Sequence, residues 1–164
     1  MGIRFGTEGW RAVMTEEFTT ENVRRVTQAV AGHFLSTART ASPTLAVGYD
    51  VRSHSDEFAK TACEVLAANG IKTILSDRTV PTCAVSRYVV DHRLAGGIVI
   101  TASHNPPTYN GIKVKEAFGG SATTETVTSI ESRLGRAPKR LSFAQAKKRR
   151  LVRRVNFLPG FLNG

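Results

Sequence analysis

The chain has 164 residues, of which 41% are hydrophobic and 22% are charged, and this is enough for one globular domain with its own core. No apolar run approaches the ~20 residues of a membrane span, and no charged start followed by an apolar segment indicates a signal peptide. We therefore expect a cytoplasmic protein without a membrane partner, and we do not expect nucleic acid as a partner in spite of the net charge of +10.

Helical and strand patterns alternate along the chain. Thr19 and Glu21 mark the start of the first helix, and Ser55 is expected to cap the second. The periodicity predicts helices over residues 20–37, 55–69, 81–91 and 123–134, and strands over residues 44–49, 71–75, 96–101 and 111–115. This alternation predicts an α/β fold, in which a largely parallel sheet is covered by helices on both faces.

The positive charge is concentrated in the last part of the chain. Residues 136–164 include nine Lys or Arg and no Asp or Glu, whereas the rest of the chain holds 14 basic and 13 acidic residues. Such a run can bind nucleic acid or another phosphate-rich partner. It can also be a solvated segment that faces an acidic neighbouring domain, and we favour this interpretation because most charge runs stay solvated.

A serine-containing loop follows the apolar strand at residues 97–100. Residues 101–106 read Thr-Ala-Ser-His-Asn-Pro, so that Ser103 and His104 stand side by side, and Lys113 comes ten residues after Ser103. Open α/β sheets bind ligands at the carboxyl ends of their strands, and a serine placed there can act as a nucleophile or carry a phosphoryl group. The simpler alternative is a serine that caps the loop by bonding to its backbone.

Three segments carry a resemblance to a known family. Residues 101–106 resemble the phosphoserine loop of the α-D-phosphohexomutases, the phosphoglucomutase and phosphomannomutase family. Residues 5–11, Phe-Gly-Thr-Glu-Gly-Trp-Arg, resemble that family's opening signature, and residues 47–52, Val-Gly-Tyr-Asp-Val-Arg, resemble a third segment. Their order and spacing fit the family's first domain. The resemblance implies a three-layer α/β/α sandwich with a mixed, mostly parallel sheet, in which one strand runs against the others.

The family has four domains, and the motifs of its later domains are absent from this sequence. These are its metal loop, its sugar-recognition loop and its late phosphate-binding loop. We therefore divide the chain into residues 1–135, the phosphohexomutase domain I with the catalytic serine, and residues 136–164, a basic tail that leads towards the absent second domain. The abrupt end favours a cut chain, and we expect such a chain to be inactive or nearly so by itself.

The resemblance assigns the central role to Ser103. In the family the resting serine carries a phosphoryl group and gives it to a hydroxyl of a hexose monophosphate. The resulting bisphosphate turns over and returns its other phosphoryl group to the serine, and a hexose 1,6-bisphosphate serves as activator. Mg²⁺ bridges the phosphoryl group and is held by three aspartates of the second domain. Ser103, through its phosphoryl group, is then the one metal contact expected in this chain.

Three further residues receive roles from the matched motifs. Lys113 and Arg11 match positions assigned to proton transfer and charge stabilisation, and they are expected with Thr7 to bind substrate or phosphate. A lysine can move a proton if burial and nearby cations lower its pKa, whereas an arginine stays charged and acts as an electrostatic clamp. The alternatives are an exposed strand-end cation for Lys113 and a surface ion pair for Arg11.

His104 adjoins the nucleophile and is expected to orient it or exchange a proton with it. The alternative is a histidine that ties the loop to backbone carbonyls. Thr101 at the start of the serine loop favours glucose or mannose phosphates over glucosamine phosphate as substrates. The sequence thus predicts the N-terminal domain of an isomerase that interconverts hexose 1-phosphate and hexose 6-phosphate.

Two alternatives to an enzyme stay open. Residues 139–154 could make the chain a polyanion- or nucleic-acid-binding module, although Phe143 is the one aromatic residue ahead of the densest basic run, and bases would find little to stack on. Apolar side chains near the C-terminus could instead be exposed and make the domain self-associate. These side chains are Phe157, Leu158, Phe161 and Leu162.

Overall fold

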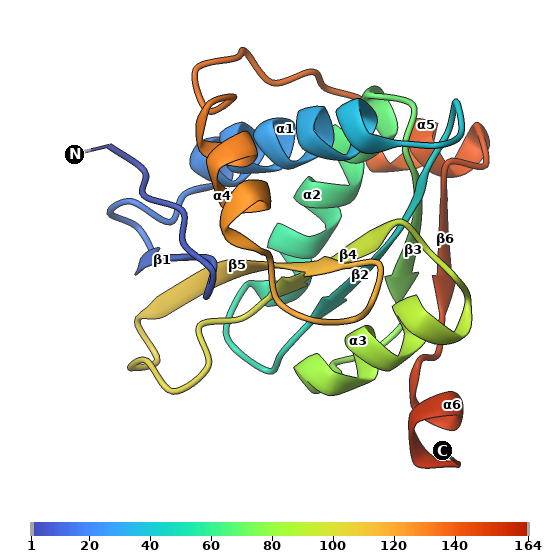
Figure 1. Ribbon diagram of the computed structural model, residues 1–164. Coiled ribbons are helices and arrows are strands. Elements are labelled where there is room, and N and C mark those ends of the chain that lie inside the picture. Colours follow the sequence, from blue (N-terminus) through green and yellow to red (C-terminus); the bar gives the residue numbers. More distant parts are fainter. Residues whose placement is uncertain (1, 164) are drawn as a thin grey trace.

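A six-stranded sheet forms the middle layer of this computed structural model, which describes residues 2–163 (Figure 1). The strands lie in the order β1-β5-β4-β2-β3-β6. Their bounds are β1 Trp10–Val13, β2 Thr44–Tyr49, β3 Lys72–Ser76, β4 Gly96–Ile100, β5 Tyr109–Glu116 and β6 Val152–Val155.

One strand runs against all the others. The pairs β2–β3, β2–β4 and β3–β6 are parallel, whereas β5 is antiparallel to both of its neighbours, β4 and β1. The mixed, mostly parallel sheet is therefore confirmed. Because β5 is reversed, it begins at the same edge of the sheet at which β2, β3 and β4 end.

Helices cover both faces of the sheet, which confirms the three-layer α/β/α sandwich (Figure 1). One face carries α1 Thr20–Thr37, α2 Ser55–Ala68, α4 Thr124–Glu131 and α5 Phe143–Lys148, and the other carries α3 Thr82–Asp91 and α6 Leu158–Leu162. Each face has its own apolar core, centred on Phe18 and Leu66 in the first case and on Val85 and Phe157 in the second. None of the described helices is both long enough and apolar enough to cross a membrane.

The prediction that Ser55 caps α2 is wrong. His54 occupies the capping position with φ of 62° and makes no capping bond with its side chain. The hydroxyl of Ser55 instead donates to Asp50 Oδ1 at 2.9 Å. The carboxylate is the stronger acceptor, and Ser55 is only 1% exposed beside it.

The sequence analysis assigned no element to residues 10–13 or to residues 136–163. The structure places β1 in the first segment and α5, β6 and α6 in the second. The basic segment therefore contributes a strand to the sheet, with β6 paired to β3. Phe157 is buried at 1% exposure, whereas Leu162 is 72% exposed, so only part of the suspected apolar surface is exposed.

Candidate active site at the carboxyl edge of the sheet

The serine loop joins β4 to β5 at the carboxyl edge of the sheet. Ser103 lies three residues beyond the end of β4, is partly exposed, and has a left-handed backbone with φ of 54°. Non-glycine residues adopt this conformation rarely, and where they do so the surrounding structure has to hold them. The contacts that hold Ser103 therefore identify the residues that shape the site.

Arg52, in the loop after β2, binds three backbone carbonyls of the serine loop and a fourth from Tyr109, the first residue of β5. Its Nη2 donates to the carbonyl oxygens of Ser103 at 2.9 Å and Asn105 at 2.6 Å. Its Nη1 donates to those of Pro106 at 2.7 Å and Tyr109 at 3.0 Å. The Arg52 side chain is only 11% exposed, so these bonds are largely shielded from water.

Asp50 holds the same loop from its other side. Its Oδ2 accepts a hydrogen bond of 2.6 Å from the Thr101 hydroxyl, and that hydroxyl oxygen accepts the backbone N–H of Ser103 at 3.1 Å. The same Oδ2 lies 3.4 Å from Arg52 Nε. Asp50 therefore links the two groups that hold the peptide bonds on either side of Ser103.

A tight turn at residues 6–9 brings a carboxylate to the site. Gly6 and Gly9 exchange backbone hydrogen bonds of 2.9 and 3.1 Å, which leaves Thr7 and Glu8 at the tip. Gly9 has φ of +86°, and a Cβ atom there would lie 2.1 Å from the carbonyl oxygen of Ile112. The turn packs this closely against β5 because Gly9 has no side chain.

Two cations from neighbouring strands converge on the Glu8 carboxylate. Arg11 on β1 pairs with Gly111 on β5, and Lys113 projects from the same face of β5 two residues later. Arg11 Nη2 and Lys113 Nζ each lie 3.7 Å from Glu8 Oε2. One anionic oxygen can thus be reached by both cations, which are 24% and 16% exposed respectively.

Arg11 also connects this cation pair to the serine loop. Its Nη1 donates to Asn105 Oδ1 at 2.9 Å, and its Nε is buried without a hydrogen-bond partner. Arg11 and Lys113 therefore lie close together, and Arg11 contacts the loop that carries Ser103. Thr7 and His104 are exposed, and neither side chain forms a hydrogen bond with any residue in the range 2–163.

The carboxylates near Ser103 are already occupied by other partners. Asp50 binds Thr101, Ser55 and Arg52, and Glu8 faces Arg11 and Lys113. Among residues 2–163, no group of three or more His, Cys, Asp or Glu side chains could hold a metal ion. These residues therefore do not form a Mg²⁺ site by themselves, and an ion at Ser103 would need ligands from outside this chain.

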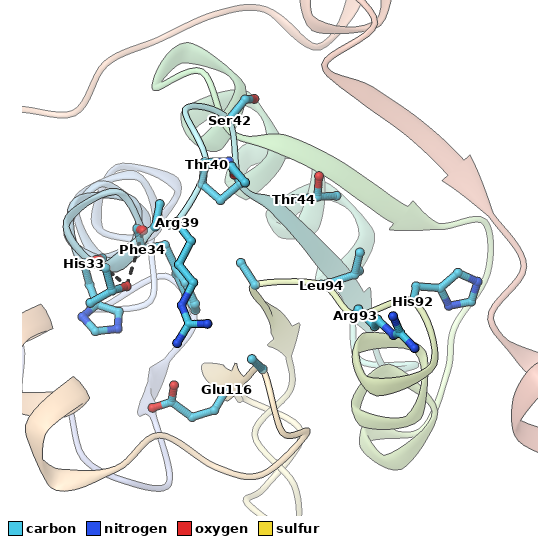
Figure 2. A pocket seen from close by; sticks show the side chains of 15 residues that line it. His33, Phe34, Arg39, Thr40, Ser42, Thr44, His92, Arg93, Leu94 and Glu116 are labelled. Carbon is cyan, nitrogen blue, oxygen red and sulfur yellow. Dashed lines mark hydrogen bonds between the residues drawn. The ribbon is translucent and has the colours of Figure 1, made fainter.

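A second hollow, of about 620 Å³, lies at the opposite edge of the sheet (Figure 2). It is lined by the C-terminal ends of α1 and α3, whose dipoles are negative there, and by Arg39, Arg93 and Glu116. These opposing charges single out no class of ligand. We therefore assign the site to the edge with Ser103. A hollow of about 380 Å³ beside this site is lined by Asp50 and Arg52 together with Asp56 and Arg78, and not by Ser103, Arg11 or Lys113.

Sequence reasoning missed the roles of Asp50 and Arg52, although it matched the segment that contains them. The available signal was their position, since both charged residues directly follow a buried strand at the ligand-binding edge of the sheet. The partners of Arg52 are backbone carbonyls, which every residue possesses, so no residue type could have identified them.

Comparisons with known proteins find relatives of this chain in sequence and in fold. The family model described as "Phosphoglucomutase/phosphomannomutase, alpha/beta/alpha domain I" matches residues 2–140. A phosphoglucomutase of Komagataeibacter xylinus is 29% identical over 98% of this chain and 32% of its own length. A phosphoglucosamine/phosphogalactosamine mutase of Sulfurisphaera tokodaii is 35% identical over 80% of this chain and 28% of its own.

Among solved structures, a Thermus thermophilus protein assigned as a phosphomannomutase matches with a TM-score of 0.86. It is 33% identical, and the match covers 99% of this chain and 35% of that one. The chain thus spans about a third of the length of the proteins that it resembles.

Proposed function

The chain belongs to the phosphoglucomutase/phosphomannomutase family, whose domain I it matches over residues 2–140, and we propose that Ser103 is the phosphoryl carrier of a hexose-phosphate mutase. The observation that carries the proposal is the arrangement at the sheet edge. A partly exposed serine with a constrained backbone lies in the loop that Arg11 contacts through Asn105, and Arg11 and Lys113 reach the same anionic oxygen. Phosphoryl transfer depends mainly on such positioning and charge stabilisation.

In the proposed reaction, a hydroxyl oxygen of a hexose monophosphate attacks the phosphorus of phosphorylated Ser103. The new oxygen–phosphorus bond forms as the bond between phosphorus and Ser103 Oγ breaks, and the product is a hexose bisphosphate. Lys113 moves the proton at the reacting oxygen, and Arg11 stabilises the charge on the phosphoryl oxygens. After the bisphosphate turns over, its other phosphoryl group returns to Ser103, and the hexose 1-phosphate and 6-phosphate are thereby interconverted.

Glu8 is the residue that an incoming anion would displace. Its carboxylate faces both cations but is 72% exposed, so water competes for it and the pairing is weak. A phosphoryl group carries more charge than a carboxylate and offers three acceptor oxygens. We therefore propose that Arg11 and Lys113 exchange Glu8 for phosphate when the site is loaded.

The complete reaction requires more than this chain provides. When bound, Mg²⁺ would neutralise charge on the transferred group, but residues 2–163 do not hold it by themselves. We therefore expect little or no turnover from the chain alone, because effective transfer requires a substrate fixed in reacting geometry. The remainder of a family protein is the expected partner, and a hexose 1,6-bisphosphate is the expected activator.

The choice of sugar is a further part of this proposal. Glucose and mannose phosphates are the substrates favoured by Thr101, yet the similar proteins include both a phosphoglucomutase and a phosphoglucosamine/phosphogalactosamine mutase. Domain I alone does not separate these activities. The cytoplasmic location expected from the sequence is likewise part of the proposal.

Peptide-mapped mass spectrometry tests the proposal directly. The purified chain is mapped before and after incubation with glucose 1,6-bisphosphate and Mg²⁺, beside Ser103→Ala and the exposed-serine control Ser53→Ala. We expect a phosphoryl group on the Ser103 peptide of the wild type and of the control, and none in Ser103→Ala. A phosphoryl group on a different serine would refute Ser103 as the acceptor, whereas an unmodified Ser103 in every sample would show that this chain cannot load itself without the rest of a family protein.

A further inference from the structure

The guanidinium of Arg52 binds the backbone of the serine loop, whereas Arg11 of the Arg11–Lys113 pair reaches this loop through the Asn105 side chain. We infer that Arg52 is a positioning residue, which orients phosphorylated Ser103 towards Arg11 and Lys113 by binding the carbonyls of the serine loop. The inference rests on the proposed function, since it concerns the group that Ser103 is proposed to carry. It is carried by three observations: the carbonyl contacts of Arg52, the hydrogen bond that holds the Ser103 N–H, and the restriction of the Arg52 contacts to this edge of the sheet.

The contacts with Arg52 fix the orientation of the backbone carbonyls in this region. The loop turns the carbonyl oxygens of residues 103, 105, 106 and 109 towards a single guanidinium, at 2.6–3.0 Å. Carbonyl oxygens carry partial negative charge, and free carbonyls here would repel a phosphoryl group on Ser103. Because Arg52 binds all four, it holds the loop folded and places a positive charge against these carbonyl oxygens at the same time.

A second set of hydrogen bonds, from Asp50 and Thr101, fixes the other side of Ser103. The Ser103 N–H is bound by the Thr101 hydroxyl, and the Ser103 carbonyl is bound by Arg52. Both groups also contact the Asp50 carboxylate. The peptide units on both sides of Ser103 are thus fixed, and its backbone stays in the left-handed conformation with φ of 54°. The direction of the Cα–Cβ bond, and hence of the phosphoryl group, follows from these fixed peptides.

The contacts of Arg52 distinguish positioning from general support of the fold. Among residues 2–163, its side chain forms hydrogen bonds or ion pairs only with the serine loop, with the Tyr109 carbonyl at the start of β5 and with Asp50. Five N–H donors in a planar fork are needed for this set of partners. A lysine keeps the charge but offers one nitrogen, so it cannot reach carbonyls spread over seven residues.

The test uses the 164-residue chain with phosphoserine incorporated at position 103 during translation. The pH titration of its phosphate is followed by ³¹P NMR in the wild type, Arg52→Lys, Arg52→Ala and the matched control Arg87→Lys, which lies on α3 and pairs with Asp91. Cations close to a phosphate favour its dianion. We therefore expect the wild-type phosphate to titrate at lower pH than a phosphoserine peptide.

In Arg52→Lys the titration should move at least about halfway back towards the peptide, although the charge is kept, because cation–phosphate attraction falls as the separation grows. Hydrogen exchange of the Ser103, Asn105 and Tyr109 amides, which all have acceptors within the loop, should become roughly tenfold faster or more. The control should match the wild type in both measurements. Thermal unfolding checks that each variant is folded. If Arg52→Ala does not fold, the test is decided by Arg52→Lys alone.

The outcomes separate the two hypotheses. A shifted wild-type titration that Arg52→Lys leaves unchanged would overturn the inference and leave the proposed function standing, even if amide exchange accelerates. A wild-type phosphate that titrates like the peptide would overturn the proposal that Arg11 and Lys113 bind the phosphoryl group, and the inference with it. Arg52 would be established as a positioning residue if the folded Arg52 variants lose the titration shift and exchange their amides faster. Arg87→Lys should show neither change.

Discussion

Replacing Gly9 with alanine should destabilise the domain far more than the same change at Gly6. Both glycines close the same turn, but only Gly9 has a left-handed backbone, at φ of +86°. An L-residue in that conformation costs about 1–2 kcal/mol. The new Cβ would also lie 2.1 Å from the carbonyl oxygen of Ile112, which belongs to the paired backbone of β5 and cannot turn aside.

Relieving that contact requires β1 and β5 to move apart, so we expect Gly9→Ala to lower the free energy of unfolding by about 2–4 kcal/mol. For a domain of this size each kcal/mol corresponds to roughly 2–4 °C in Tm. At Gly6 a Cβ meets only the Gly9 carbonyl oxygen, at an ordinary 3.8 Å. Gly6→Ala should therefore stay within about 0.5 kcal/mol of the wild type.

Urea unfolding of the wild type and both variants measures the difference. Alanine restricts the unfolded chain equally at the two positions, so a comparison of the variants cancels that contribution. The backbone NMR signals of Arg11 and Lys113 should also shift in Gly9→Ala, because Gly9 fixes the turn that carries Glu8 to both cations. Equal stabilities of the two variants, to within about 0.5 kcal/mol, would refute the close packing of this turn against β5.

Three further outcomes test the fold. Phe157→Ala should lower the free energy of unfolding by about 3–5 kcal/mol, because Phe157 is 1% exposed. Leu162→Ala should leave the free energy of unfolding nearly unchanged, because Leu162 is 72% exposed. Urea unfolding measures both, and equal effects would contradict the burial of Phe157. Burial, together with the nearby charge of Lys113, lowers the pKa of Lys115 in the folded chain below the 10.5 of an exposed lysine. The charged form of Lys115 therefore destabilises the folded chain at neutral pH. This destabilisation decreases as the pH rises from the folded pKa to 10.5, because Lys115 then loses its proton in the folded chain. Lys115→Met should therefore gain stability over the wild type, and urea unfolding between pH 7 and 10.5 should show the gain shrinking; a constant difference would contradict it. Burial raises the pKa of the Cys63 thiol, whereas Cys83 is exposed, so a thiol reagent should label one cysteine in the native chain and two in urea.

The sequence predicted the elements whose cores are local and periodic. The helix with Val23, Val26, Val30 and Phe34 on one face forms as α1, and the apolar run before Ser103 forms as β4. These segments bury a face that their own residue spacing defines, so periodicity is sufficient to find them.

The strand β6 could not be found in this way. Its four residues, Val-Arg-Arg-Val, include two exposed arginines and stand within a basic run. It is a strand because it pairs with β3, where Arg154 lies beside Leu75, and that pairing spans a long separation in sequence. Pairing with neighbouring strands determines whether such a short edge segment forms a strand, whereas its basic composition suggests a solvated loop.

The site was predictable to the extent that its side chains are chemically distinctive. A serine beside a histidine, and a lysine ten residues on, could be identified from the motif. What the motif did not reveal is the dependence of the loop on Arg52, because hydrogen bonds to backbone carbonyls leave no trace in residue types. The role of Glu8 as the carboxylate between Arg11 and Lys113 also depended on knowing that the turn folds back onto β5.

The reversed direction of β5 explains why these groups meet at all. A parallel strand after β4 would have required a crossover, and the residues after the serine loop would have begun at the far edge of the sheet. Because β5 is antiparallel, Thr101 and Arg11 flank Gly111 on either side in one row across three strands. A Cβ at Gly111 would lie 2.5 Å from the Thr101 carbonyl oxygen and 3.0 Å from Arg11 Cγ. The missing side chain thus leaves room for Arg11 beside the serine loop, and a single local reversal of the sheet brings the proposed phosphoryl carrier and both cations to one edge.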